Sequence, residues 1–360
     1  MGKNLMSMFP ASTGTPTALK DAFKDHFLIG AALNEAEITG RDANAVALAK
    51  THFNSISPEN VLKWEPVHPK PDKYDFAVAD RYVEFGQENG MFIIGHTLVW
   101  HNQTPEWVFQ DEHGKDVDRN MLLGRMRDHI HTVVGRYKGR IKGWDVVNEA
   151  LNEDGTLRQS RWMKIIGEDY IAKAFEFAHE TDPEAELYYN DFTLVEEPKR
   201  KSAIELIKKL KTQGVPITAV GLQGHLKMDW PTLENEEATI VGFARLGVKV
   251  MITELDIDVV PATQGSKTAD INVNIQLVAG ADTYSNGLPD DVQQALAKRY
   301  ADLFGVYLKH RDVIERVTLW GVTDGDSWLN TQGRVNHPLL FDRDGKPKPA
   351  FTAVIQAAAK

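Results

Sequence analysis

Short apolar runs typical of β-strands recur along this chain, and longer helical patterns separate them. The first run starts at residue 27 and the last at residue 316, so the seven intervals average about 41 residues, close to the size of one strand plus one helix. Most runs are continuously apolar rather than alternating, which is typical of parallel strands buried on both faces. The eight predicted strands are Phe27–Leu33, Ser55–Asn60, Met91–Leu98, Gly143–Glu149, Leu187–Asp191, Ala219–His225, Val248–Asp256 and Arg316–Val322.

The segments between these runs show the 3.6-residue apolar stripe of amphipathic helices. Lys201–Lys211 has its apolar residues on one side and lysines opposite, and Gly214 follows where a helix C-cap is expected. Tyr170–His179 and Asp291–Lys309 show the same pattern. Val260–Pro289 is weakly patterned and follows the seventh strand, so we predict a loop over the face that a barrel uses for its active site.

Eight alternating units predict a single (β/α)8 TIM barrel, with residues 1–360 as one domain and the barrel proper at about 20–356. The main alternative is a doubly wound open sheet. It is disfavoured because the first strand and the residue after it, Phe27–Asn34, contain one glycine and no phosphate-binding loop. Dinucleotide binding is therefore not expected.

Composition narrows the possible partners. The net charge of −10 argues against nucleic acid or an anionic membrane surface as a ligand, and no apolar stretch is long enough to cross a bilayer. The absence of cysteine excludes a thiolate nucleophile and cysteine-ligated metal. Met1–Pro16 has no apolar core of signal-peptide length, which leaves the location open: secreted or periplasmic if this is a processed form, and otherwise cytoplasmic.

Two glutamates end strand-like runs: Glu149 follows Gly143–Asn148, and Glu254 follows Val248–Thr253. Acidic side chains are rarely buried without partners, so a carboxylate at each position needs an explanation. In a barrel both would lie at the C-terminal ends of the strands, where active sites are found. Paired carboxylates facing one cleft are the arrangement that hydrolyses glycosidic bonds.

The other polar and aromatic residues at the strand ends suit a sugar ligand. Amides and acids bond hydroxyl groups, while aromatic faces cover the C–H faces of the rings. His96 and His101 are five residues apart in a strand and loop, which is not the spacing of a helical zinc motif, so we predict no metal site. The strand-end set comprises Glu59, Asn60, Lys63, His96, Trp100, His101, Asn148, Glu149, Asn190, Asp191, Gln223, His225, Glu254, Asp256, Trp320 and Trp328.

Four sequence motifs that contain residues of this set resemble those of glycoside hydrolase family 10, the retaining endo-β-1,4-xylanases. They are Gly95–His101, Trp144–Ala150, Ile252–Asp256 and Leu319–Trp328, and the resemblance runs in order from about Phe27 to Phe351. Pro338–Asp342 and Lys348–Phe351 resemble the closing segment of the family. The combination of motifs is far more specific than any one of them.

The resemblance implies a role for each matching residue. Glu149 would be the general acid/base and Glu254 the nucleophile, with Asn148 bonding the sugar 2-hydroxyl. His225 would contact the nucleophile and tune its ionisation, Gln223 would hold the acid/base, and Asp256 would support the site. The implied substrate-binding residues are Glu59, Asn60, Lys63, His96, Trp100, Tyr189, Trp320 and Trp328.

The resemblance further implies hydrolysis of xylan or xylo-oligosaccharides by double displacement, with no cofactor. We also expect a monomer, and because the chain shows no linker or second domain, we expect no separate carbohydrate-binding module. Many relatives continue after Asn190-Asp191 with Tyr-Asn, whereas this chain has Phe192-Thr193, which puts the contacts with the leaving part of the substrate in doubt. Two alternatives stay open. One is another retaining barrel glycanase, such as a cellulase or mannanase, and the other is a non-catalytic carbohydrate-binding barrel.

Overall fold

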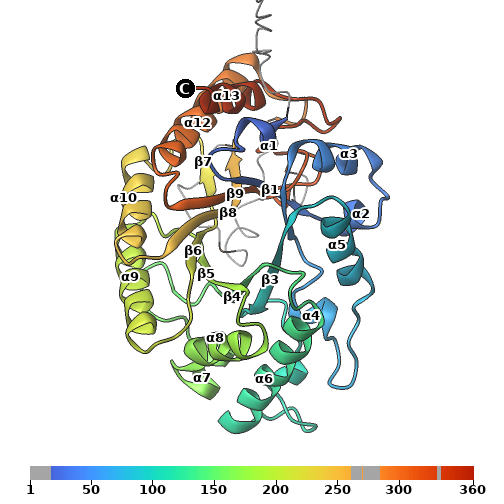
Figure 1. The fold of residues 1–360 in the computed structure, drawn as a ribbon, viewed down its shortest axis with the longest axis vertical. Helices are drawn as coiled ribbons and strands as arrows, with labels where there is room; N and C mark the ends of the chain where they lie inside the picture. The colour runs from blue at the N-terminus through green and yellow to red at the C-terminus, as the bar shows by residue number, and fades with distance from the viewer. Residues whose placement is uncertain (1–17, 261–269, 271–283, 331–333) are drawn as a thin grey trace, which may run out of the picture.

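The computed structural model describes residues 18–260, 270, 284–330 and 334–360 of the chain. Parallel strands form a closed barrel at the centre, and helices surround it (Figure 1). The sheet order is β6-β5-β4-β3-β2-β1-β9-β8, and an additional pairing of β6 with β8 closes the ring. The predicted (β/α)8 barrel is confirmed.

All eight predicted strands are present, with ends that differ by a few residues from the predicted ones. Eight strands build the barrel, and a short ninth, β7, extends one side of it by pairing with β8. The strands are β1 (Leu28–Leu33), β2 (Ser55–Pro58), β3 (Phe92–Val99), β4 (Gly143–Asn148), β5 (Glu186–Asp191), β6 (Ala219–Leu222), β7 (His225–Lys227), β8 (Lys249–Asp258) and β9 (Ile314–Leu319).

The sixth predicted strand, Ala219–His225, is interrupted in the structure. β6 ends at Leu222, and pairing with β8 resumes at His225 opposite Asp256. Gly224 lies between the two pieces with a φ of +80°, a left-handed conformation that side chains other than glycine rarely adopt. The chain therefore turns at Gln223 and Gly224, between the end of β6 and the start of β7.

The helices lie outside the barrel in the positions that the apolar stripes indicate. α9 covers the predicted Lys201–Lys211 segment, α8 covers Tyr170–His179, and α12 covers Asp291–Lys309. Short helices also occur in the loops. The described helices are α1 (Leu19–Ala22), α2 (Glu35–Ile38), α3 (Ala43–His52), α4 (Trp64–Val67), α5 (Ala77–Glu88), η1 (Glu106–Val108), α6 (Arg119–Arg136), α7 (Arg161–Ile166), α8 (Tyr170–Thr181), α9 (Glu197–Thr212), α10 (Leu233–Ala244), α12 (Asp290–Lys309) and α13 (Pro349–Ala358).

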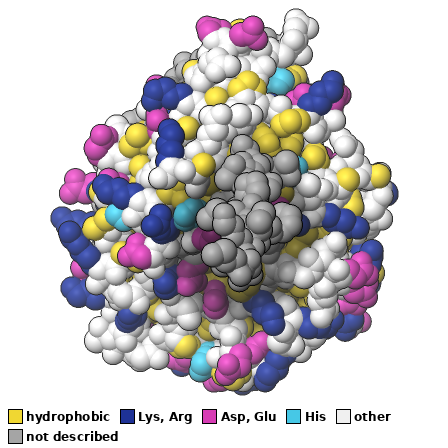
Figure 2. All heavy atoms as spheres, turned by 45° about the horizontal axis from the view of Figure 1, so that its top comes forward, with side chains coloured by type: hydrophobic (Ala, Val, Ile, Leu, Met, Phe, Trp, Pro, Cys, Tyr) yellow, Lys and Arg dark blue, Asp and Glu magenta, His cyan; other side chains and the backbone are white. Residues whose placement is uncertain are grey.

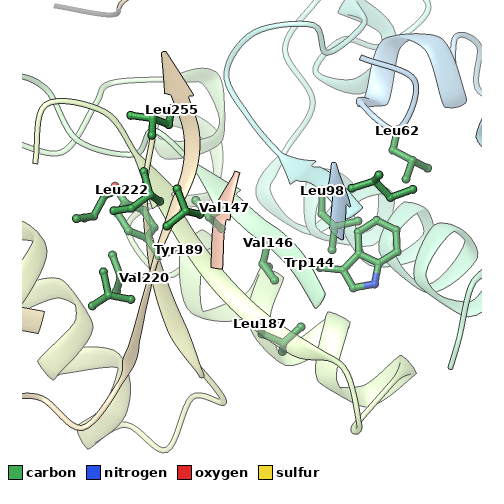
Figure 3. Close-up of a cluster of buried hydrophobic side chains, with 14 of the residues drawn as sticks. Leu62, Leu98, Trp144, Val146, Val147, Leu187, Tyr189, Val220, Leu222 and Leu255 are labelled. Carbon is green, nitrogen blue, oxygen red and sulfur yellow. The ribbon is translucent and has the colours of Figure 1, made fainter. Parts of the chain in front are cut away.

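Two apolar layers hold the barrel together. The larger lies between strands and helices, and includes Trp144, Leu187 and Tyr189 (Figure 3). The smaller comprises Ile94, Tyr188, Ala219 and Met251, from four different strands. Only the barrel interior brings β3 and β8 together, so this second cluster fills the inside of the barrel.

Side chains alternate between these two layers along β5. Because successive residues of a strand point to opposite faces, Tyr188 points into the barrel and Tyr189 points toward the helices. By the same alternation Asn190 points inward and Asp191 outward. The alternation along β5 decides which of its residues can reach a ligand in the barrel mouth.

On the face drawn in Figure 2, acidic and basic side chains are interspersed around the grey residues. Among the described helices, none combines the length and apolar character needed to cross a membrane. The predicted N-terminal segment Met1–Pro16 and most of the predicted loop Val260–Pro289 lie outside the described residues.

Candidate active site

A cavity opens at the C-terminal end of the barrel. Its lining contains every residue to which the resemblance gives a role except Asp256 and Tyr189, and it adds Gln103, which the sequence did not single out. Of the strand-end set, His101, Asn190 and Asp191 also lie outside the lining. The strand ends and the loops that follow them therefore converge on one site. The lining residues are Glu59, Asn60, Lys63, His96, Trp100, Gln103, Asn148, Glu149, Gln223, His225, Glu254, Trp320 and Trp328.

Glu149 follows the last residue of β4 in a left-handed conformation, with a φ of 58°. Its amide donates to the carbonyl of Asn190 on β5, which fixes the turn. Both carboxylate oxygens accept hydrogen bonds: Oε1 from Nε2 of Gln223 at 2.9 Å, and Oε2 from Nε1 of Trp100 at 2.8 Å. The carboxylate is thus held rigidly in the cavity wall, 9 % exposed.

Burial raises the pKa of Glu149 to about 6, although the hydrogen bond from Gln223 opposes the shift. The negative charge of Asp191, behind the barrel wall, raises the pKa further. A carboxylic acid in this range is protonated in a useful fraction near pH 6. It can therefore donate a proton to a leaving group and afterwards accept one.

Glu254 lies within β8 and faces the same cavity. Its Oε1 accepts from Nδ2 of Asn190 at 2.8 Å, and its Oε2 lies 3.1 Å from Nε2 of His225. Burial alone would raise the pKa of this carboxyl, but the hydrogen bond from His225 and the electrostatic interaction with His96 outweigh it, so the pKa is lowered. Glu254 is therefore ionised where Glu149 is still largely protonated.

His225 is positioned by a second carboxylate behind it. Its Nδ1 lies 2.9 Å from Oδ1 of Asp256, whose Oδ2 accepts from Nε1 of Trp328 at 2.7 Å. Burial would lower the pKa of His225, but the two carboxylates beside it raise the pKa to about 10. His225 is therefore a cation at neutral pH. Asp256 does not line the cavity, and its place behind His225 agrees with a supporting role.

An amide chain connects the two carboxylates. Nδ2 of Asn190 donates to both Glu254 and Oδ1 of Asn148, at 2.8 and 3.0 Å. Nδ2 of Asn148 in turn lies 3.3 Å from Oε1 of Glu149. Thr253 donates to Oδ1 of Asn190 at 2.6 Å, which leaves the Asn190 amide nitrogen facing the carboxylate. The sequence placed Asn190 at a strand end but did not predict this contact.

Lys63 and its neighbours form the other end of the cavity. Nζ of Lys63 donates to Oδ1 of Asn60 at 3.0 Å and to Oε1 of Gln103 at 2.9 Å, and lies 4.8 Å from the centre of the Trp100 ring. Burial lowers the pKa of Lys63, while the nearby carboxylates of Glu254 and Glu59 oppose the shift. A buried ammonium surrounded by amide oxygens is suited to binding sugar hydroxyls.

His96 and the tryptophans complete the wall. Nδ1 of His96 lies 2.9 Å from Oδ2 of Asp145 inside the barrel, and its ring meets Trp320 edge-on with centroids 5.4 Å apart. Trp328 meets the ring of His225 in a similar way at 5.0 Å. Among the described residues, no group of three or more histidines and acids is placed to hold a metal ion.

Tyr189 is where the structure departs from the predicted site. Its side chain is fully buried on the outer face of β5 and does not line the cavity, because the strand alternation turns it away from the barrel interior. Its hydroxyl bonds Asp191 at 2.5 Å. The expected substrate contact of Tyr189 is therefore replaced by a contact behind the wall.

The model of glycosyl hydrolase family 10 matches residues 18–357 of this chain. The chain belongs to this family. The family match covers the whole described barrel, including every residue of the cavity described above.

Individual relatives match over nearly their full length. Endo-1,4-beta-xylanase A of Xylanibacter ruminicola is 44 % identical over 99 % of this chain and 97 % of its own. Beta-1,4-xylanase of Dictyoglomus thermophilum is 43 % identical over 94 % of this chain and 90 % of its own.

Solved structures of the family superimpose closely. A GH10 endoxylanase retrieved from a sugarcane soil metagenome is 48 % identical, with a TM-score of 0.89 over 95 % of this chain and 100 % of that chain. A structure solved as a mutant in complex with xylotriose is 38 % identical, with a TM-score of 0.85 over 94 % of this chain and 99 % of that chain.

Phe192-Thr193, the pair at which we expected a departure from many relatives, follows β5 directly. The ring of Phe192 is buried and lies under Nζ of Lys199, 3.7 Å from the ring centre, so it does not line the cavity. Thr193 is half-buried, with a φ of 56°, and its hydroxyl lies 3.2 Å from Oε1 of Glu153.

Proposed function

We propose that this family 10 chain is a retaining endo-β-1,4-xylanase, which cleaves internal xylosidic bonds by double displacement. The observation that supports this most is the unlike ionisation of Glu149 and Glu254 in one cavity. One carboxyl group is poised to donate a proton and the other to attack, which is the division of labour that glycoside hydrolysis requires.

In the first step, an oxygen of Glu254 bonds the anomeric carbon while the glycosidic bond breaks. The proton of Glu149 passes to the departing xylosyl oxygen, and a covalent glycosyl-enzyme remains. In the second step, Glu149 removes a proton from water as the water oxygen bonds the anomeric carbon and releases Glu254. Two inversions at one carbon retain its configuration.

The amides and cations around Glu254 support this chemistry. Positive charge develops on the sugar in the transition state, and the ionised Glu254 opposes it directly. Asn148 lies beside both catalytic carboxylates through its bonds to Glu149 and Asn190, where it can bond the sugar 2-hydroxyl.

Xylan and xylo-oligosaccharides are the proposed substrates. The names of the relatives and the xylotriose complex of a family member support this choice. Trp320 and Trp328 line the cavity. The resemblance to the family implies that such a tryptophan pair favours xylose over sugars that carry a hydroxymethyl group, such as glucose or mannose. We further propose that the enzyme acts as a monomer, which light scattering would show as a mass near 40.4 kDa.

The deciding experiment is xylan digestion followed by NMR in real time. Early products should be internal fragments with the β-anomer at the new reducing end, and the α-anomer should appear only by mutarotation. A first-formed α-anomer would rule out retention, and faster hydrolysis of carboxymethylcellulose or mannan than of xylan would rule out the substrate.

Two matched variants test catalysis itself. Glu149→Gln and Glu254→Gln keep the size of the side chain but remove the proton donor and the nucleophile. Each should lower kcat/KM on xylan by roughly a thousandfold or more. Wild-type binding to xylan without hydrolysis would instead indicate a carbohydrate-binding barrel.

A further inference from the structure

We propose that Lys199, Asp191 and Tyr189 form a positioning relay that holds the acid/base Glu149 in place from behind the barrel wall. The proposal rests on the proposed function of Glu149. These three residues do not line the cavity, so they would act through the backbone next to Glu149 and not on the substrate.

The relay begins with a charge pair that is costly to bury. Nζ of Lys199, on α9, lies 2.9 Å from Oδ1 of Asp191 on β5, and both side chains are 0 % exposed. Removing two charges from water carries a large desolvation penalty, and apolar residues of similar volume often replace such pairs without loss of stability. A pair in this position therefore calls for a role beyond packing.

Tyr189 connects Asp191 to the backbone that follows Glu149. The Tyr189 hydroxyl donates to Oδ2 of Asp191 at 2.5 Å and accepts from the amide of Ala150 at 3.2 Å. Both hydrogen-bonding functions of the hydroxyl are thus used. Tyr189 itself is fixed by the packed side chains of neighbouring strands (Figure 3).

The amide that Tyr189 holds directly follows Glu149. Glu149 has a left-handed backbone with a φ of 58°, which is unfavourable for a residue with a side chain and must be stabilised by its surroundings. The bond from Ala150 to Tyr189 fixes the peptide on one side of this residue, and the bond from the Glu149 amide to the Asn190 carbonyl fixes the other. The direction of the Glu149 carboxyl depends on both.

The relay also places a negative charge near the acid/base. Burial is the main reason that the pKa of Glu149 is raised, and the charge of Asp191 adds to that rise. The other charged or titratable groups that face Glu149 from the elements around it are Glu254, Lys63, His101 and Arg158. Of these groups, Glu254 also raises the pKa of Glu149.

If the relay holds Glu149 in place, breaking it should lower kcat/KM by an amount that depends on the leaving group of the substrate. Tyr189→Phe removes the hydroxyl and little else, so proton donation by Glu149 should become less effective. On xylotetraose, whose leaving group needs a proton, kcat/KM should fall by roughly tenfold to a hundredfold. On 2,4-dinitrophenyl β-xylobioside, whose leaving group needs no proton, kcat/KM should stay within about twofold.

Tyr188→Phe is the matched control. Tyr188 is the adjacent buried tyrosine on the same strand, but it points into the barrel and its hydroxyl bonds Glu186. Any loss in this variant should be equal on the two substrates. Equal losses in Tyr189→Phe as well would overturn the relay, because they would show a structural role only.

A pH profile tests the charged part of the relay. Asp191→Asn removes the negative charge that raises the pKa of Glu149, so the alkaline limb of kcat/KM on xylotetraose should move to lower pH. If the alkaline limb of a folded Asp191→Asn variant stays at the wild-type pH, the charge of Asp191 has no role in the relay. If Asp191→Asn does not fold, the Tyr189→Phe comparison still decides the proposal. A wild-type enzyme that leaves xylotetraose intact would refute the proposed function instead.

Discussion

Nε2 of His225 lies 3.1 Å from Oε2 of Glu254, and the imidazole is held there by Asp256 on its other side. The pKa of His225 is raised to about 10, so the ring is a cation beside Glu254 throughout the working range of such an enzyme. This one contact accounts for much of the difference between the two catalytic carboxyls, because burial alone would raise the pKa of both.

Removing the imidazole should therefore move the acid limb of the pH profile. His225→Asn eliminates the cation that keeps the pKa of Glu254 low, so Glu254 should protonate at a higher pH than in the wild type. Because the attack needs an ionised Glu254, kcat/KM on xylan should fall more at pH 4.5 than at pH 6. An acid limb identical to that of the wild type would contradict this role of His225.

Gln223 should affect the alkaline limb of the pH profile of kcat/KM. Gln223→Met keeps the length of the side chain but removes the donor to Oε1 of Glu149, which opposes the burial-driven rise in the pKa of that carboxyl. The pKa of Glu149 should then rise above about 6, and the alkaline limb of kcat/KM should move to higher pH. The acid limb, set by Glu254, serves as the internal control and should not move.

Thr193 offers a test of backbone strain next to the site. Its φ of 56° is unfavourable for a β-branched residue, whereas asparagine tolerates the left-handed region. Thr193→Asn should raise the free energy of unfolding by about 1 kcal/mol, measured by denaturant titration. Thr193→Ala, which removes the hydroxyl without favouring this conformation, should give no gain.

Glu236 should make stability depend on pH. Burial raises the pKa of this α10 carboxyl to about 7, although a hydrogen bond from Tyr307 opposes the shift. The unfolded chain ionises near the ordinary value of 4.5, so Glu236 costs nothing below that pH. Its cost grows as the pH rises to 7 and is complete above that value.

Glu236→Gln should therefore stabilise the protein by about 3 kcal/mol at pH 8 and by almost nothing at pH 4. The adjacent Glu237 is the control. It is half-buried and paired with Lys309 and His310, and these bonds lower its pKa. Glu237→Gln should give no stabilisation at pH 8. A gain at pH 8 in both variants would point to general charge reduction instead.

The sequence predicted the barrel because each strand is buried on both faces and so leaves a continuous apolar run. Phe27–Leu33 corresponds to β1 (Leu28–Leu33) within one residue, and the apolar stripe of Lys201–Lys211 marks the packed face of α9. The break between β6 and β7 was missed. Gly224 is consistent with the break, but a lone glycine does not show that a strand is interrupted.

The positions of Glu149 and Glu254 were likewise predictable, because an acid at the end of an apolar run is conspicuous. The hydrogen bonds that surround these two carboxyl groups were not predictable. The bond from Asn190 to Glu254 depends on the register of β5 between β4 and β6, which places Asn190 level with Asn148 and Gly221. Registers are set by packing between strands and leave no local pattern in the sequence.

The sequence alone determined which residue types meet at the mouth of the barrel. The apolar runs show where each strand ends, and the residues at those ends can be read directly from the chain. The tertiary structure decided what each one touches. It turned Tyr189 away from the cavity and toward Asp191 and Ala150, and it placed His225 within hydrogen-bonding distance of the Glu254 carboxyl. These outcomes depend on burial and on distances of a few ångströms between residues far apart in the chain, and local residue order does not determine either quantity.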